Sequence, residues 1–310
     1  SGRGSTGGSI NLVSKAPSLT DRISSTVALG TDNFTRVTID TNQTLSNTDS
    51  TAVRLNVLYH DQDTPGRNEV SNKRYGIAPS IALGIETDTQ VTLSAFYLKQ
   101  ENIPDYGIPW VPDSNIPLAA FANEAPPVDF SNWYGLTSRD FEDTETTMLT
   151  AQVEHKLSDN IEVQNITRYG ITERDSMITA PRFLETTSTL IRRSDEKYRD
   201  QEDIILSNQT NVIFDINSGE NWEHKILAGI EFSGENETRF TQVLTGTDSP
   251  PTDLFNPTPS DPYLENYRRT GGKSTADSKS AAVYLSDSIK INEKWQLNGG
   301  LRWDKFDLEY

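Results

Sequence analysis

The chain contains no cysteine among its 310 residues, which excludes disulfides, cysteine-ligated zinc, iron–sulfur clusters and thiol catalysis. Its three histidines give little basis for a histidine-rich metal site. Long apolar runs are missing as well, and none approaches the roughly 18 residues of a membrane-spanning helix. Positive charge is scarce: 28 Lys and Arg stand against 45 Asp and Glu, for a net charge of −17. The chain therefore lacks the basic footprint that nucleic-acid phosphates require.

Helical periodicity is nearly absent, and alternation with a period of two residues takes its place. In the clearest run, Trp295, Leu297, Leu301 and Trp303 fall on one face, and amide and charged residues fall on the other. An apolar face with an aromatic at each end is typical of a membrane-facing strand, because Trp and Tyr settle at both interfaces. A strand of a soluble sandwich also alternates. Similar runs occur near residues 53–60, 91–98, 222–232 and 281–286.

The connections between these runs alternate in length. Short turns are expected near residues 45–50, 86–89, 158–160, 217–221 and 292–294. Long loops are expected near residues 61–72, 102–145, 173–200 and 234–277. Short turns at one end and long loops at the other are typical of an outer-membrane barrel, whereas compact soluble domains rarely contain several such loops. The pattern predicts an all-β fold, a transmembrane antiparallel β-barrel.

About eleven strands are predicted in this way. Outer-membrane barrels usually have an even number of strands, and a half-barrel would leave two unpaired edges in lipid. The first residue is Ser1, not an initiator Met, and the last lies inside a strand-like run. We therefore expect the chain to be part of a longer protein.

Three sequence motifs carry a resemblance to a known family. The run RGSTGGSINLVSKAP (Arg3–Pro17) has a Gly-rich turn, a strand of the type Ile-Asn-x-Val-Ser-Lys and a following proline. NIPDYGIP (Asn102–Pro109) and GGLRWD (Gly299–Asp304) are the other two. They resemble, in order, the plug-to-barrel junction, the third extracellular loop and a barrel strand of TonB-dependent siderophore receptors. The resemblance extends over essentially the whole chain and is strongest for the catecholate-type receptors.

The resemblance implies a barrel of about 22 strands, of which about half is present. Residues 1–17 would be the tail of an N-terminal plug domain, and residues 18–310 the N-terminal part of the barrel. It implies uptake of a ferric siderophore of catecholate type across the outer membrane of a Gram-negative bacterium, driven by the TonB–ExbB–ExbD complex through the plug. It also implies a monomer in contact with outer-membrane lipid and lipopolysaccharide. The ferric siderophore is cargo, and no catalytic residue, resident metal or intrinsic cofactor is implied.

The longest predicted loop, residues 102–145, is rich in aromatic residues and proline. Exposed aromatics on a long loop usually bind a ligand, and planar rings stack on planar ligands. Tyr106, Trp110, Trp133 and Tyr134 are therefore candidate contacts for the aryl rings of a catecholate. An equally supported alternative is that these rings pack the loop against itself or against its neighbours.

Several arginines lie in or beside the predicted loops. Arg192, Arg193, Arg268 and Arg269 are candidate ligand contacts, since guanidinium groups attract and stack on an anionic, aryl-rich complex. Pairing with loop acids or with lipopolysaccharide phosphates is the alternative for each. All three histidines fall in predicted strands, which makes heme a less favoured ligand.

Two other functional classes stay open at this point. One is a passive porin-like barrel, against which the plug-like residues 7–17 argue. The other is a soluble β-rich adhesin or carbohydrate-binding module, which should purify without detergent. The string Gly2-x-Gly4-x-x-Gly7 matches a dinucleotide-binding fingerprint, but no strand precedes it and a strand-like run follows it, so no nucleotide site is expected.

Overall fold

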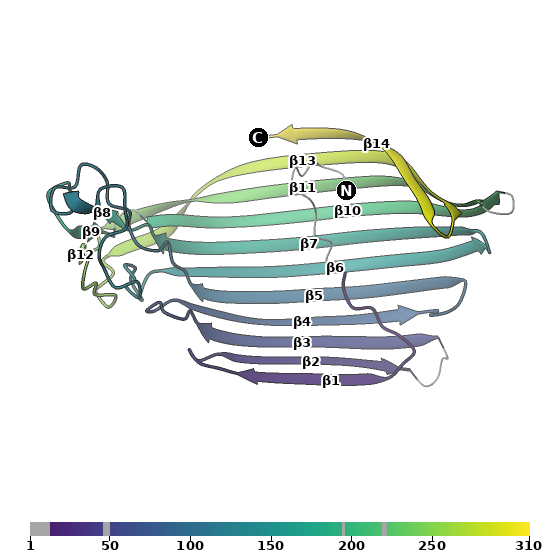
Figure 1. Cartoon of the computed structure of the whole chain (residues 1–310), viewed down its shortest axis with the longest axis horizontal. Coiled ribbons are helices and arrows are strands. Elements are labelled where there is room, and N and C mark those ends of the chain that lie inside the picture. Colours follow the sequence, from purple (N-terminus) through teal and green to yellow (C-terminus); the bar gives the residue numbers. More distant parts are fainter. Residues whose placement is uncertain (1–12, 46–49, 194–195, 219–221) are drawn as a thin grey trace.

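The computed structural model describes residues 13–45, 50–193, 196–218 and 222–310. Within these residues, eleven strands form one antiparallel sheet whose order follows the chain (Figure 1). The strands are β1 (Arg22–Leu29), β2 (Thr35–Thr44), β3 (Thr51–Asp63), β4 (Ser71–Leu83), β5 (Thr89–Ile103), β6 (Phe141–Ser158), β7 (Ile161–Thr179), β10 (Glu196–Ser218), β11 (Trp222–Gly246), β13 (Glu265–Asn292) and β14 (Trp295–Glu309). The predicted all-β class and the predicted number of strands are confirmed.

A second, three-stranded sheet lies beyond one end of the large sheet, at the left of Figure 1. It consists of β8 (Arg182–Phe183), β9 (Leu190–Arg192) and β12 (Thr252–Asp253), and a single turn of 3-10 helix, η1 (Ala119–Phe121), lies in the same connections. In the described part of the chain, no helix has the length and apolar content needed to cross a bilayer.

The strands that lead toward the small sheet are longer than predicted. β11 has 25 residues and β13 has 28, so much of the expected loop 234–277 is regular strand. The expected loop 173–200 is shortened in the same way, because β7 continues to Thr179 and β10 begins at Glu196. These loop boundaries were wrong because a strand with water on both faces has no apolar face, and therefore none of the alternation that identifies a strand in sequence.

The two faces of the large sheet differ in character. Side chains alternate along each strand, so residues directly opposite each other on neighbouring strands share a face. Leu149, Tyr169 and Leu206 lie side by side in this way, and all three are exposed. The only other sheet in the described residues is the small one at the end, so this apolar face is not buried between two stacked sheets. Exposed apolar rows of this extent indicate an apolar environment.

The opposite face is polar, and the segment before β1 lies against it. Arg54 donates two hydrogen bonds to Asp40, at 2.7 and 2.8 Å, and Lys15 donates a third at 2.9 Å. Ser18 and Asn42 exchange two hydrogen bonds, at 2.9 and 2.7 Å. These contacts fix the segment on β2 and β3. The first twelve residues of the predicted plug tail lie outside the described residues.

Gly229 is required on the polar face because an aromatic ring covers it. A Cβ atom at Gly229 would lie 2.3 Å from the ring of Tyr284 and 2.5 Å from Oδ1 of Asn211. The ring is held there by its hydroxyl, which donates to Asn211 (2.5 Å) and accepts from Gln209 (2.7 Å). Gly234, on the same strand but the other face, has open space at its Cβ position.

We expect Gly229→Val to destabilise the full-length protein by about 1–3 kcal/mol, since the ring must leave its hydrogen bonds or the strands must separate. Urea unfolding of the protein in detergent micelles, followed by heat-modifiable mobility on gels, measures this change. Gly234→Val is the matched control and should unfold within about 0.5 kcal/mol of the parent. Equal stability of the two variants would contradict the packing described here.

Candidate ligand-binding site

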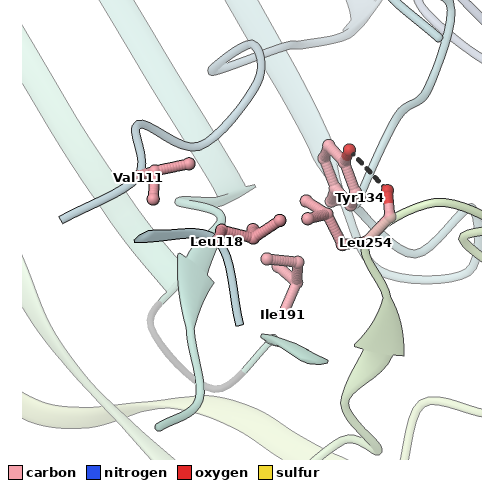
Figure 2. Close-up of a cluster of buried hydrophobic side chains, with 5 residues drawn as sticks. All are labelled: Val111, Leu118, Tyr134, Ile191 and Leu254. Carbon is pink, nitrogen blue, oxygen red and sulfur yellow. Dashed lines mark hydrogen bonds between the residues drawn. The ribbon is translucent and has the colours of Figure 1, made fainter. Parts of the chain in front are cut away.

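Three connections come together at the end of the large sheet, and we call their described parts the cap: residues 104–140, 180–193 and 247–264. The cap has an apolar core of its own, to which all three connections contribute (Figure 2). Its buried residues are Val111, Leu118, Tyr134, Ile191 and Leu254. The cap is therefore one packed unit built from all three connections.

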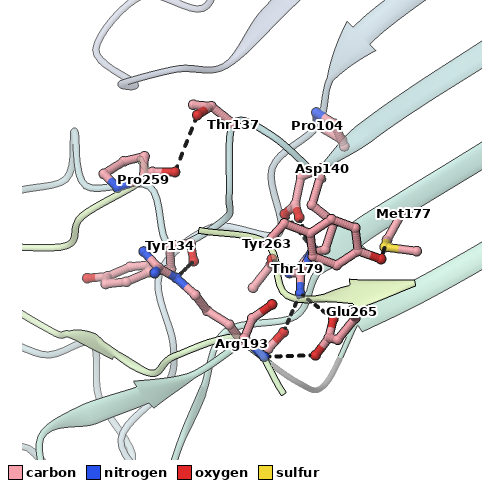
Figure 3. Close-up of polar contacts among 12 residues, drawn as sticks. Pro104, Tyr134, Thr137, Asp140, Met177, Thr179, Arg193, Pro259, Tyr263 and Glu265 are labelled. Carbon is pink, nitrogen blue, oxygen red and sulfur yellow. Dashed lines mark hydrogen bonds and ion pairs between the residues drawn. The ribbon is translucent and has the colours of Figure 1, made fainter. Parts of the chain in front are cut away.

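Arg193 ties two of these connections together from the interior of the cap. Its side chain is wholly buried, and it donates from Nε to the carbonyl of Tyr134 at 3.1 Å (Figure 3). Its other two nitrogens donate to Asp261 (2.5 Å) and to the carbonyl of Thr258 (2.6 Å). Burial lowers the pKa of the guanidinium, and the Asp261 carboxylate opposes that shift. Arg193 thus holds the cap together from a position that a ligand outside it does not reach.

A second buried arginine fastens the cap to the strands. Arg139 donates to Asp140 (2.8 Å), to the carbonyl of Arg193 (2.8 Å) and to the hydroxyl of Thr179. Asp140 in turn accepts from the backbone N–H of Thr179 at 2.8 Å. Glu265, at the start of β13, lies 3.7 Å from the Arg139 guanidinium. The end of β7 is therefore joined to the cap through charged hydrogen bonds, and the start of β13 through an ion pair.

Two of the four predicted aromatic contacts belong to the interior of the cap. Trp133 is buried and donates its indole N–H to the carbonyl of Pro104 at 3.0 Å. Tyr134 is buried in the apolar core and donates its hydroxyl to the carbonyl of Leu254 at 2.9 Å. For these two rings, the structure shows the packing role that the sequence left open.

The four predicted arginines are not brought together. Arg269 forms a two-pronged ion pair with Asp200, at 2.6 and 2.8 Å, and its guanidinium lies 3.9 Å from the centre of the Phe240 ring. Arg192 is half-buried and donates to a backbone carbonyl of its own connection at 3.2 Å. Arg268 is exposed on β13. With Arg193 inside the cap, these residues do not form one cationic patch.

A hollow of about 720 Å³ is present where the first two cap connections meet. Two of the predicted aromatic residues line it, and both are open to solvent, Tyr106 being 54% and Trp110 63% exposed. The complete lining is Tyr106, Trp110, Pro112, Ala180, Pro181, Arg182, Phe183 and Lys197.

The lining combines two kinds of chemistry. Tyr106, Trp110 and Phe183 offer aromatic surface, and Arg182 and Lys197 supply positive charge. Aromatic faces stack on planar rings, and guanidinium and ammonium groups attract anionic oxygens. The hollow therefore suits a ligand that is both flat and negatively charged.

The predicted sites did not include Phe183 or Lys197. Phe183 lies in the predicted loop 173–200, so treating aromatic residues of a long loop as candidate contacts, as was done for residues 102–145, would have found it there too. Lys197 has no comparable signal, because it is one of many charged residues in that loop.

Comparison with known proteins identifies the architecture. Residues 76–310 match the family model described as TonB dependent receptor-like, beta-barrel. The chain belongs to the TonB-dependent receptor family. Over 321 residues it is 32% identical to the catecholate siderophore receptor Fiu of Escherichia coli K12, covering all of this chain and 41% of that receptor. It is 33% identical over 329 residues to the probable TonB-dependent siderophore receptor PiuA of Acinetobacter baumannii, covering 99% of this chain and 43% of PiuA.

Solved structures agree with the family match. The open crystal form of the ferric-catecholate import receptor Fiu superposes with a TM-score of 0.87 at 31% identity, covering 100% of this chain and 48% of that one. The siderophore receptor PiuA superposes with a TM-score of 0.88 at 30% identity, covering 99% of this chain and 45% of the PiuA chain. This receptor chain spans about two fifths of the length of the curated relatives it matches. In a barrel of this family, the apolar face of the sheet is the lipid-facing side and the polar face is the lumen side.

We expect Arg193→Ala to loosen the cap of this receptor, because Asp261 and the carbonyls of Tyr134 and Thr258 lose their donors. The free energy of local opening should fall by about 3 kcal/mol, measured as faster hydrogen exchange of residues 247–264 in the full-length protein. Arg268→Ala removes the same charge at an exposed position and should leave exchange unchanged. Equal hydrogen-exchange rates of residues 247–264 in the two variants would show that Arg193 does not hold the cap connections together.

Proposed function

We propose that the full-length protein is an outer-membrane receptor that takes up a ferric siderophore of the catecholate class. The hollow that places Tyr106 and Trp110 beside Arg182 and Lys197 is the observation that carries this proposal. A ferric catecholate complex is anionic and presents flat aryl rings, so it matches both kinds of side chain. The name of Fiu supports the same ligand class, and the name of PiuA supports siderophore uptake without specifying the class.

The remaining parts of the proposal follow from membership of the family. The cap captures the complex, a plug closes the lumen, and the TonB–ExbB–ExbD complex supplies energy through that plug. Residues 1–17 are the end of the plug, which the contacts of Lys15 and Ala16 with Asp40 and Arg54 on the lumen face support. The receptor is a monomer in the outer membrane of a Gram-negative bacterium and contacts lipopolysaccharide. Family membership favours this function over a passive porin or a soluble adhesin.

The ligand class is tested by binding to the purified full-length receptor. Quenching of tryptophan fluorescence by a ferric catechol complex should saturate at lower concentration than quenching by a ferric hydroxamate or by heme, because only the catecholate offers both negative charge and exposed aryl rings. Uptake of the radiolabelled iron complex should require a functional TonB. An equal or stronger response to heme would contradict the catecholate assignment.

The hollow itself is tested by substitution. The double variant Tyr106→Ala/Trp110→Ala should weaken binding of the ferric catechol complex by about tenfold or more, since each stacking partner contributes roughly 0.5–1.5 kcal/mol. Equilibrium binding of the radiolabelled ferric catechol complex measures this affinity. It does not depend on tryptophan fluorescence, which the loss of Trp110 would change. Phe130→Ala is the control, because Phe130 is exposed on the same connection but outside the hollow. Matching affinities in the double variant and the control would place the ligand elsewhere.

A further inference from the structure

The first strand of the sheet, β1, is poorly suited to bear a pull from the chain that precedes it. It has eight residues, every one exposed or half-buried, and among the described residues it pairs on one side only, with β2. The hydrogen bonds between antiparallel strands lie perpendicular to the strand direction. A pull on the beginning of β1, away from the sheet, would therefore load these bonds one pair at a time and strip β1 from β2.

The segment before β1, residues 15–21, is hydrogen-bonded to the two strands beyond it. Asn42 of β2 accepts from the backbone N–H of Ser18 (2.9 Å) and donates to the carbonyls of Ser18 (2.7 Å) and Thr20 (2.9 Å). Asn42 is only 2% exposed. Both hydrogen bonds from the amide nitrogen of this buried side chain thus serve the backbone of the segment, and Asn42 is a specific binding partner for it.

Charged groups hold the start of the same segment. Arg54 of β3 donates from Nε and Nη2 to Asp40 of β2, at 2.8 and 2.7 Å, and from Nη1 to the carbonyl of Ala16 at 2.8 Å. Lys15 supplies a third donor to Asp40, at 2.9 Å. Asp40 is 8% exposed, and hydrogen bonds between charged groups are stronger than neutral ones. We call Asp40, Asn42 and Arg54 the anchor.

The segment is bound along its whole length. At its end, the backbone N–H of Thr44 donates to Asp21 at 2.7 Å. With this contact, six hydrogen bonds join residues 15–21 to β2 and β3. Pro17 is buried, and because proline has no backbone N–H its burial leaves no donor unpaired. Six bonds over seven residues approach the roughly one hydrogen bond per residue of a folded protein, so the segment is a fixed part of the wall and not a loose linker.

These contacts give the segment a load path that bypasses β1. A force from the preceding chain reaches Lys15 and Ala16 first, and the anchor passes it to β2 and β3. Each of these two strands is paired on both sides, β2 with β1 and β3, and β3 with β2 and β4. The charged contacts at Asp40 must break before the force acts on β1.

We propose that the anchor bears mechanical load during transport. Asp40, Asn42 and Arg54 hold residues 15–20 on the lumen wall while the part of the plug before them is displaced, so the pull ends on β2 and β3 and β1 stays in the sheet. This inference rests on the proposed function, which places a TonB-driven plug before residue 18. The anchor residues are positioning residues, because they contact the segment and not the cargo.

The load path is tested by force spectroscopy on the purified full-length receptor in a lipid bilayer, with the pull applied at its N-terminal end. In the double variant Asp40→Asn/Arg54→Gln, detachment of the segment should need about half the force that it needs in the parent, or less, since charged hydrogen bonds are about twice as strong as neutral ones. β1 should then leave the sheet in the same step. Arg168→Gln removes a lumen-facing charge on β7, away from the segment, and should behave as the parent.

A cross-link tests whether the segment stays on the wall during transport. The 310 residues contain no cysteine, so no other thiol of this chain competes with the pair Ser18→Cys/Asn42→Cys. In cells with TonB, transport of a radiolabelled ferric catechol complex by the oxidised pair should stay within about twofold of transport after reduction. Heat-modifiable mobility on gels establishes that this variant and the two force variants fold.

Either measurement can overturn the inference. Equal detachment forces in Asp40→Asn/Arg54→Gln and in Arg168→Gln would show that the anchor bears no load. Transport that stops on oxidation of the cysteine pair and returns on reduction would show that the segment must leave the wall. A parent receptor that does not transport the ferric catechol complex would reject the proposed ligand class, and the force measurement, which needs no ligand, would still decide the inference.

Discussion

Alternation of side chains across a continuous antiparallel sheet is the constraint on which this structure depends. Every described strand of the large sheet pairs with its neighbour in the chain, so the backbone groups between strands are satisfied and each residue is assigned to one face. The same alternation separates Leu149 from Thr150 in the middle of the sheet and Glu173 from Arg174 near the cap. One geometric rule thus produces both an apolar surface suited to lipid and a polar face toward the lumen.

How far the sequence predicts this fold depends on what surrounds each strand. The run from Trp295 to Trp303 was predicted because one face meets lipid and the other meets water, and the structure confirms it as β14. The outer part of β11, up to Gly246, was not predicted, since water on both faces removes the apolar period. Strand number and order were therefore accessible from sequence, while strand length beyond the membrane was not.

The candidate site was likewise only partly predictable from the sequence. Tyr106 and Trp110 were predicted and line the hollow, whereas Trp133 and Tyr134 come from the same aromatic loop and are buried. Nothing in the sequence around these residues distinguishes the exposed pair from the buried pair. Tyr134 is buried because Leu254, 120 residues later in the chain, lies against it and accepts its hydroxyl hydrogen bond. Contacts of that separation are fixed by the assembled cap, so residue type and spacing alone do not reveal them.

The buried arginines of the cap also determine how it can move. Arg193 couples the first connection to the third, and Arg139 couples both to the ends of β7 and β13. If the three connections moved independently, the hydrogen bonds and ion pairs of Arg193 and Arg139 would have to break one at a time in a poorly hydrated interior. We therefore expect any motion of the cap to move it as one body about its attachment to the strands. The hollow between Trp110 and Phe183 lies within that body, so such a motion would carry the hollow as a unit and leave its lining together.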